Sequence, residues 1–114
     1  MLQPTTEEIV SLKALHGRLW QQVHADRTFV LKAIDRATHL ELQKKVLGES
    51  IAQQSEVVMN ADQAVRMEEE TVKAAVVWPV DQTVLTAEAG TIPALFQRIL
   101  AISGFVAPEE PVEL

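Results

Sequence analysis

The chain contains no cysteine and no tyrosine, and only five of its 114 residues are aromatic. The lack of cysteine excludes thiol catalysis, thiolate zinc sites and disulfides. The four glycines are widely separated, so no glycine-rich loop that could cradle a phosphate is present. The longest apolar run, at 74–77, is far shorter than the roughly 18 residues that span a bilayer. The amino terminus does not resemble a signal peptide, and we therefore expect a soluble, intracellular protein.

Basic residues are also scarce. The chain has 16 acidic and 10 basic side chains, which gives a formal net charge of −6. Binding to nucleic-acid phosphates needs clustered Lys and Arg, whereas Lys44-Lys45 is the one adjacent basic pair here. We therefore expect neither a nucleic-acid partner nor a membrane partner. The length and the apolar content of 47% predict a single domain over residues 1–105, followed by an acidic, proline-containing tail, 106–114, that we expect to be flexible.

The amino-terminal part predicts a helix and then a hairpin. Thr5 and Glu8 have the spacing of a capping box, apolar residues recur at helical spacing up to His16, and Gly17 is suited to end the helix. Two strand-like runs follow, 19–25 and 28–34, around a short polar break. The break lacks Asn-Gly or Asp-Gly, so its turn type is left open. An isolated hairpin is marginal in water, and this one must pack on helices or extend a partner's sheet.

The rest of the chain is predicted to be mainly helical. Asp35 can cap a helix that reaches about Gly48, and Asn60 can cap one over 61–77 that ends before Pro79. Asp81 can cap a single turn, and a strongly apolar helix is expected over 91–102. Residues 47–60 are ambiguous between helix and loop. The predicted fold class is α+β, a mostly helical small domain in which one amino-terminal β-hairpin packs against about four helices.

No arrangement of residues predicts catalysis. The three histidines lack the spacing of a zinc site, and Asp35 and His39, four residues apart, are best explained by a contact at a helix start. The carboxylates of Glu68–Glu70 diverge around a helix and predict a solvated face. We therefore expect no enzyme, no catalytic residue, no cofactor and no metal. Trp20 and Trp78 are expected mainly to pack within the protein, and an interface is the alternative for Trp20.

The order of the segments resembles a known family. The segments are a helix ending in Lys13-Ala14-Leu15-His16-Gly17, the strand Thr28–Ile34, the acidic run Glu68–Glu70, the stop Val76-Val77-Trp78-Pro79 and a closing Ser103-Gly104-Phe105. In this order the chain resembles the small tail-assembly chaperones of contractile-tailed bacteriophages, including the baseplate hub assembly chaperones of T-even-type phages. The resemblance covers most of residues 7–105. Lys32 stands where the family pattern has an arginine, His39-Leu40 stand where it often has an aromatic, and 47–60 looks like an insertion.

The resemblance implies a phage-encoded protein in the cytoplasm of the bacterial host that binds a tail, baseplate or tape-measure protein until assembly. A hairpin edge or an apolar helix face would cover the client. The residues expected to contact the partner are Trp20, Phe29, Leu31, Leu95, Phe96 and Phe105. Two alternatives stay open, namely a structural subunit retained in the virion and a small regulatory binder of a host protein. The client and the oligomeric state are not determined by the sequence.

Overall fold

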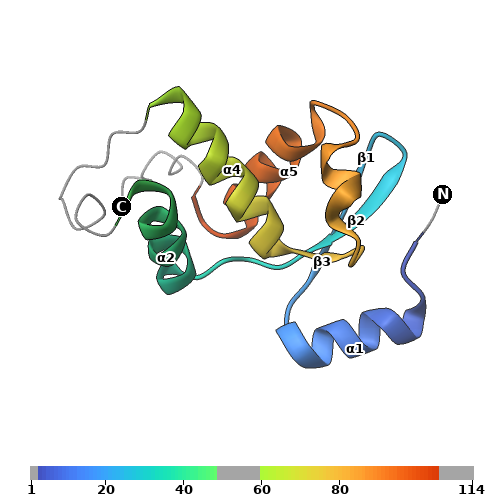
Figure 1. Cartoon of the computed structure of the whole chain (residues 1–114). Helices are drawn as coiled ribbons and strands as arrows, with labels where there is room; N and C mark the ends of the chain where they lie inside the picture. Colours follow the sequence, from blue (N-terminus) through green and yellow to red (C-terminus); the bar gives the residue numbers. More distant parts are fainter. Residues whose placement is uncertain (1–2, 49–59, 106–114) are drawn as a thin grey trace, which may run out of the picture.

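A computed structural model of the chain describes residues 3–48 and 60–105, and it shows an α+β domain that is mainly helical (Figure 1). This confirms the predicted fold class. A three-stranded antiparallel sheet has the strand order β1-β2-β3. The elements in chain order are α1 (Thr6–His16), β1 (Trp20–His24), β2 (Arg27–Leu31), α2 (Arg36–Leu47), α4 (Ala61–Ala75), β3 (Val76–Trp78), the 3₁₀ helix η1 (Gln82–Thr86) and α5 (Thr91–Ile102).

The helix starts follow the local signals in the sequence. The hydroxyl of Thr5 accepts from the amide of Glu8, whose carboxylate accepts from the amide of Thr5 in return, so the predicted capping box of α1 is present. Asp35 caps α2 by accepting from the amide of Thr38. Asn60 and Asp81 likewise cap α4 and η1. These side chains satisfy amides that have no partner within their helices.

The predicted hairpin is present and has a two-residue turn. Ala25 and Asp26 both have positive φ, 49° and 60°, which is the conformation of a type I′ turn. His24 pairs with Arg27 directly across this turn, and the pairing continues to Trp20 opposite Leu31. The second strand ends at Leu31, three residues earlier than the sequence predicted, because the chain leaves the sheet to reach the cap of α2 at Asp35.

The third strand was not predicted. The sequence predicts residues 76 and 77 in the preceding helix, but α4 ends at Ala75 and Val76–Trp78 form β3 beside β2. The prediction was wrong because the apolar run fits a helix as well as a strand, and its pairing partner lies more than 40 residues earlier in the chain. Trp78 is buried, with 8% of its surface exposed, as the sequence predicted.

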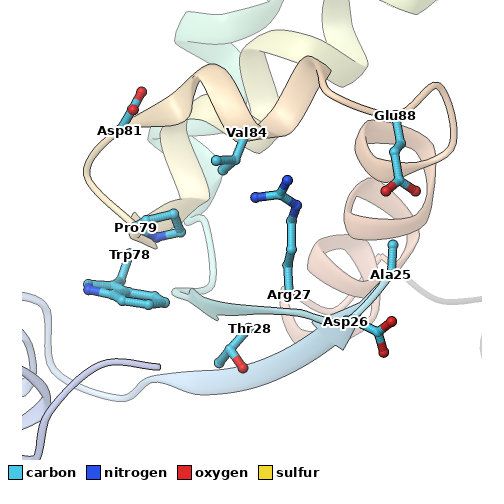
Figure 2. Close-up of a pocket in the computed structure, with 9 residues that line it drawn as sticks. All are labelled: Ala25, Asp26, Arg27, Thr28, Trp78, Pro79, Asp81, Val84 and Glu88. Atoms are coloured by element: carbon cyan, nitrogen blue, oxygen red, sulfur yellow. The ribbon is translucent and has the colours of Figure 1, made fainter. Parts of the chain in front are cut away.

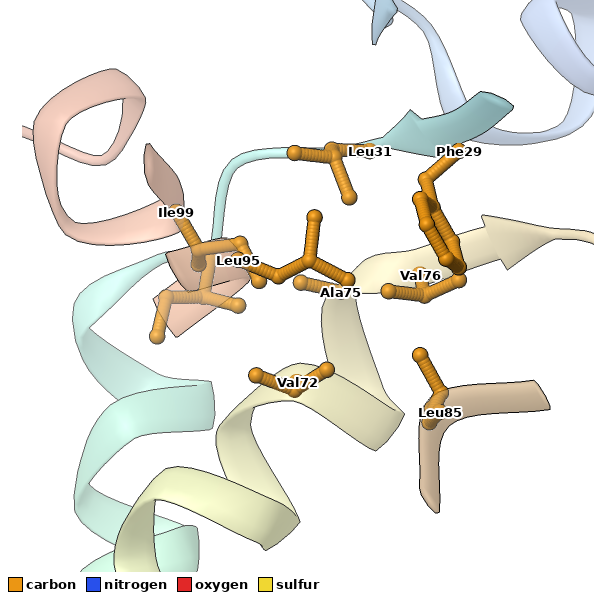
Figure 3. Packing of buried hydrophobic residues seen from close by; sticks show 9 residues of the cluster. Phe29, Leu31, Val72, Ala75, Val76, Leu85, Leu95 and Ile99 are labelled. Atoms are coloured by element: carbon orange, nitrogen blue, oxygen red, sulfur yellow. The ribbon is translucent and has the colours of Figure 1, made fainter. Parts of the chain in front are cut away.

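The main core lies between one face of the sheet and the helices α4, η1 and α5 (Figure 3). It is formed by Phe29, Leu31, Ile34, Val72, Ala75, Val76, Leu85, Leu95 and Ile99. Phe29 and Leu31 are two residues apart on β2, so their side chains point to the same face of the sheet. The expected apolar face of α5 therefore faces this core, with Leu95 and Ile99 fully buried.

Helix α2 packs on α4 in a smaller cluster of Val46, Leu47 and Met67. The ammonium group of Lys45 bonds the carboxylate of Glu70 at 2.8 Å across the same two helices. Glu70 is therefore not on a purely solvated face, as the sequence suggested for the Glu68–Glu70 run. Its side chain is only 18% exposed.

One face of α4 is buried. It carries Met67, Thr71, Val72 and Ala75, whereas Val65 on the same helix is exposed. The α2 cluster on one side and the sheet on the other together select this face. Most of the predicted insertion at residues 47–60 lies outside the described residues. The predicted flexible tail at 106–114 lies entirely outside them.

Candidate functional site

The clearest candidate interaction site is the outer edge of β1. In the parts of the chain that the structure describes, β1 pairs only with β2, so it is an edge strand of the sheet. Residues of an antiparallel strand alternate between bonding the neighbouring strand and pointing away from it, and His24 beside the turn bonds β2. The backbone groups of Trp20, Gln22 and His24 therefore bond to β2, whereas those of Gln21 and Val23 point outward. Such outward groups can hydrogen-bond a strand from another protein.

The side chains of β1 alternate between the two faces of the sheet, and the aliphatic one lies on the exposed face. Trp20 and Gln22 lie on the same face of the sheet as the core residues Leu31 and Phe29 opposite them. His24 shares that face, while Gln21 and Val23 lie on the other face. As a result Val23, the strand's one aliphatic residue, is 46% exposed. The register with β2 imposes this, because Phe29 and Leu31 must face the core. An exposed aliphatic side chain therefore lies beside outward backbone groups.

Two contacts hold the edge in place. The amide of the Gln22 side chain donates to the carbonyl of Val23 at 2.9 Å, which occupies one outward acceptor. The guanidinium of Arg18 lies 4.9 Å from the ring centre of Trp20, a cation–π distance. Trp20 is half-buried, so part of its ring faces solvent at the start of the strand. The edge thus combines an aromatic ring, an aliphatic side chain and backbone groups available for pairing.

Three of the six residues predicted to contact a partner lie in the core. Phe29, Leu31 and Leu95 are each 0% exposed. Their strong apolar pattern comes from packing of the sheet on α5, and in this conformation a partner cannot reach them. The set of predicted contact residues therefore narrows to Trp20, Phe96 and Phe105.

These three residues do not form one surface. Phe96 is partly buried against the main core. Phe105, just after α5, is exposed and its ring lies 4.6 Å from that of His39 in α2. Figure 1 places α2 and β1 on opposite sides of the molecule. Of the predicted residues, only Trp20 therefore lies at the β1 edge. Sequence reasoning missed Gln21 and Val23, because no local signal reveals which strand is at the edge.

A second candidate surface is α1, which buries none of its residues. In Figure 1 the helix lies at the bottom of the view, with the strands between it and the helices α4 and α5. The indole N–H of Trp78 donates to the carboxylate of Glu8 at 3.1 Å and connects α1 to β3. Amide donation by Thr5 and the indole of Trp78 lower the pKa of Glu8. Val10 and Leu15 remain largely exposed on this helix.

A pocket of about 440 Å³ lies between the hairpin turn, the end of β3 and η1. Figure 2 shows the side chain of Arg27 extending from the hairpin toward Val84 of η1, with Glu88 nearby. Asp26 and Asp81 add two further carboxylates, but Asp81 accepts from the amide and hydroxyl of Thr83. These bonds lower the pKa of Asp81. With one guanidinium among three carboxylates, the pocket has a net negative lining and suits a cationic group better than an anion.

The titratable side chains of the described residues form no cluster that could bind a metal ion. No helix in the described part of the chain has the length and apolarity to cross a membrane. Asp35 and His39 meet at the start of α2 through their backbones, because the amide of His39 donates to the carbonyl of Asp35 at 3.0 Å. Their side chains have other partners, since the ring of His39 packs on Phe105 and the carboxylate of Asp35 accepts from the amide of Thr38.

Comparisons of the chain with models of known protein families, with curated proteins and with solved structures found no match. The resemblance to phage tail-assembly chaperones therefore stays a prediction from the order of sequence segments. The functional argument rests on the surfaces described above.

Proposed function

We propose that the protein is a non-catalytic assembly chaperone of a contractile phage tail, which binds a tail, baseplate or tape-measure protein in the host cytoplasm. The observation that carries the proposal is the outer edge of β1, where the outward backbone groups of Gln21 and Val23 lie beside an exposed aliphatic side chain. The order of sequence segments, which resembles that of tail-assembly chaperones, supplies the class of client.

The mechanism is addition of a client strand to the sheet. A segment of the client would pair with β1 through backbone hydrogen bonds, while Val23 on one face and Trp20 on the other contact its alternate side chains. Backbone pairing gives affinity without strict sequence demands, which suits a chaperone that must release its client at assembly. The exposed apolar surface of the client strand would be covered until the tail subunits replace the chaperone.

The experiment is affinity capture from phage-infected cells with wild-type protein and two variants. Gln21→Pro removes an outward N–H and places a ring on the edge, a change that edge strands tolerate. Gln21→Ala is the matched control, because it keeps the amide. We expect wild type and Gln21→Ala to capture a tail, baseplate or tape-measure protein, and Gln21→Pro to lose it while remaining folded by circular dichroism. Capture by all three proteins would contradict strand addition at β1.

Mass spectrometry of purified virions separates the proposal from its nearest alternative. A chaperone is expected to be absent from finished particles, whereas a structural subunit would be present in stoichiometric amount. Capture of a host protein in place of every tail component would instead support the regulatory alternative.

A further inference from the structure

We propose that the protein forms a two-fold symmetric homodimer through α1, in which Leu15 of each copy packs into a groove beside α1 of the other. The groove has a volume of about 360 Å³ and lies between the first turns of α1 and the end of β3. It is lined by Thr5, Glu7, Glu8, Ser11, Leu12, Trp78 and Val80. The inference concerns a different surface from the β1 edge and does not depend on the proposed function.

Two apolar side chains at or near this groove are unusually exposed. Leu15 is 77% exposed in the last turn of α1, and Val80 is 86% exposed at the groove. Within the groove, Leu12 and Trp78 supply further apolar surface. Aliphatic side chains left in water favour association, because burying them releases ordered solvent. The molecule thus carries both a protruding leucine and a groove in which Leu12, Trp78 and Val80 form an apolar side next to the polar side chains of α1.

The positions of the two features fit an antiparallel pair of α1 helices. The groove follows residues 5–12 of the helix, whereas Leu15 lies in its last turn. A two-fold axis perpendicular to α1 places the last turn of one copy against the first turns of the other. Leu15 then meets the groove of the second copy, and the same contact forms at the other end of the pair. Glu8, Leu12 and Leu15 follow each other at spacings of four and three residues, so they share one side of the helix.

Charge favours the same arrangement. The first turn of α1 carries Glu7 and Glu8, and the last turn carries Lys13 and His16, with Arg18 just beyond. An antiparallel pair brings the acidic turn of each copy near the basic turn of the other, whereas a parallel pair would bring like charges together. The carboxylate of Glu8 already accepts from Trp78, so Glu7 is the acidic group best placed to meet a basic side chain of the second copy.

A second copy is the occupant that this geometry selects. The first turns of α1, together with Trp78 and Val80, form the groove and carry acidic groups, while the last turn of α1 carries Leu15 and basic groups. Two identical copies related by a two-fold axis therefore satisfy both contacts at once. Only an 11-residue helix and one groove from each copy take part. We therefore expect an interface near the lower end of specific complexes, roughly 1,200 Å² or less in total, and a dimer that dissociates on dilution.

Sedimentation velocity of the full chain from low micromolar to submillimolar concentration tests the proposal. Wild type is expected to shift from monomer to dimer, and Leu15→Ser to remain monomeric with an unchanged circular dichroism spectrum. Val23→Ser, which removes an exposed aliphatic side chain from the β1 edge, is the matched control and is expected to dimerise as wild type does. A monomeric wild type at all concentrations, or a dimer that survives Leu15→Ser, overturns the proposal. So does a dimer that Val23→Ser abolishes.

Charge exchange tests the antiparallel arrangement itself. Glu7→Lys and Lys13→Glu are each expected to weaken the dimer about tenfold, since each places like charges at both ends of the pair. The double variant Glu7→Lys/Lys13→Glu restores opposite charges and is expected to recover most of the wild-type affinity. A double variant as weak as the two single variants combined would overturn the antiparallel geometry.

Discussion

The indole N–H of Trp78 donates to the carboxylate of Glu8 across 70 residues of sequence. The bond links α1, which buries none of its residues, to the end of β3. Glu8 also completes the capping box of α1 through the amide of Thr5. One carboxylate therefore both starts the helix and attaches it to the sheet.

Trp78→Phe should loosen α1 without unfolding the domain. The variant keeps most of the buried ring but removes the donor to Glu8, so α1 should detach more often. We expect hydrogen exchange of the α1 amides to accelerate several-fold, while exchange in α5 changes little. Trp20→Phe is the control, because the Trp20 indole is not the donor to Glu8. Equal acceleration in both variants would show that the bond does not hold α1.

Leu95→Ala and Leu15→Ala should differ widely in stability. Leu95 is fully buried in the core, and its truncation is expected to lower the free energy of unfolding by about 2–5 kcal/mol. Leu15 is largely exposed, and its truncation is expected to change stability by less than about 0.5 kcal/mol. Urea denaturation of dilute, monomeric samples measures both. A mild effect of Leu95→Ala would mean that α5 is not packed on the sheet and would return Leu95 to the set of possible partner contacts.

The elements that sequence predicted correctly are those with local signals. Thr5 with Glu8 and the caps at Asp35 and Asn60 identify helix starts within four residues, and the structure has all three caps. Strand β3 was missed because its pairing with β2 is non-local, and the same holds for the bond between Trp78 and Glu8. Local patterns report propensity, whereas pairing depends on which segments meet in space.

The candidate site was less predictable than the fold. The sequence pointed to the hairpin as a partner surface, and the candidate edge strand β1 belongs to the hairpin. The most apolar residues of the hairpin, however, are buried in the core. Phe29 was expected at a partner surface because it lies on the hairpin, yet a large aromatic side chain equally suits burial. Val23 is a less conspicuous residue, and its exposure follows only from the register of β1 on β2.

Ser103→Ala should destabilise the junction between α5 and α2. The hydroxyl of Ser103 accepts from the amide of Ile34 at 3.0 Å, and Ile34 is a core residue. Removing the acceptor leaves a part-buried amide unpaired, which is expected to cost about 1–3 kcal/mol. Ser103→Thr keeps the hydroxyl and should recover most of the stability. Chemical denaturation compares the three proteins, and a Ser103→Ala variant as stable as the wild type would show that this hydrogen bond does not stabilise the junction.

His39 should make the protein less stable in mild acid. Burial lowers the pKa of His39 below its ordinary value of 6.5, and the positive charge of Arg36 acts in the same direction. Its ring packs on Phe105, and Nδ1 has no hydrogen-bond partner among the described residues. The unfolded chain therefore binds a proton at a higher pH than the native protein does. The free energy of unfolding must then fall as the pH drops below about 6.5 and through the native pKa.

The variant His39→Phe keeps a ring against Phe105 and removes the titration. Its stability should be nearly independent of pH between about 6.5 and 5, where the wild type loses stability. Below this range both proteins should weaken together, because Glu8, Asp35, Glu70 and Asp81 have pKa values lowered by hydrogen bonds that protonation breaks. Urea denaturation at a series of pH values gives both profiles. Parallel profiles above pH 5 would show that His39 is not the group that couples protonation to unfolding.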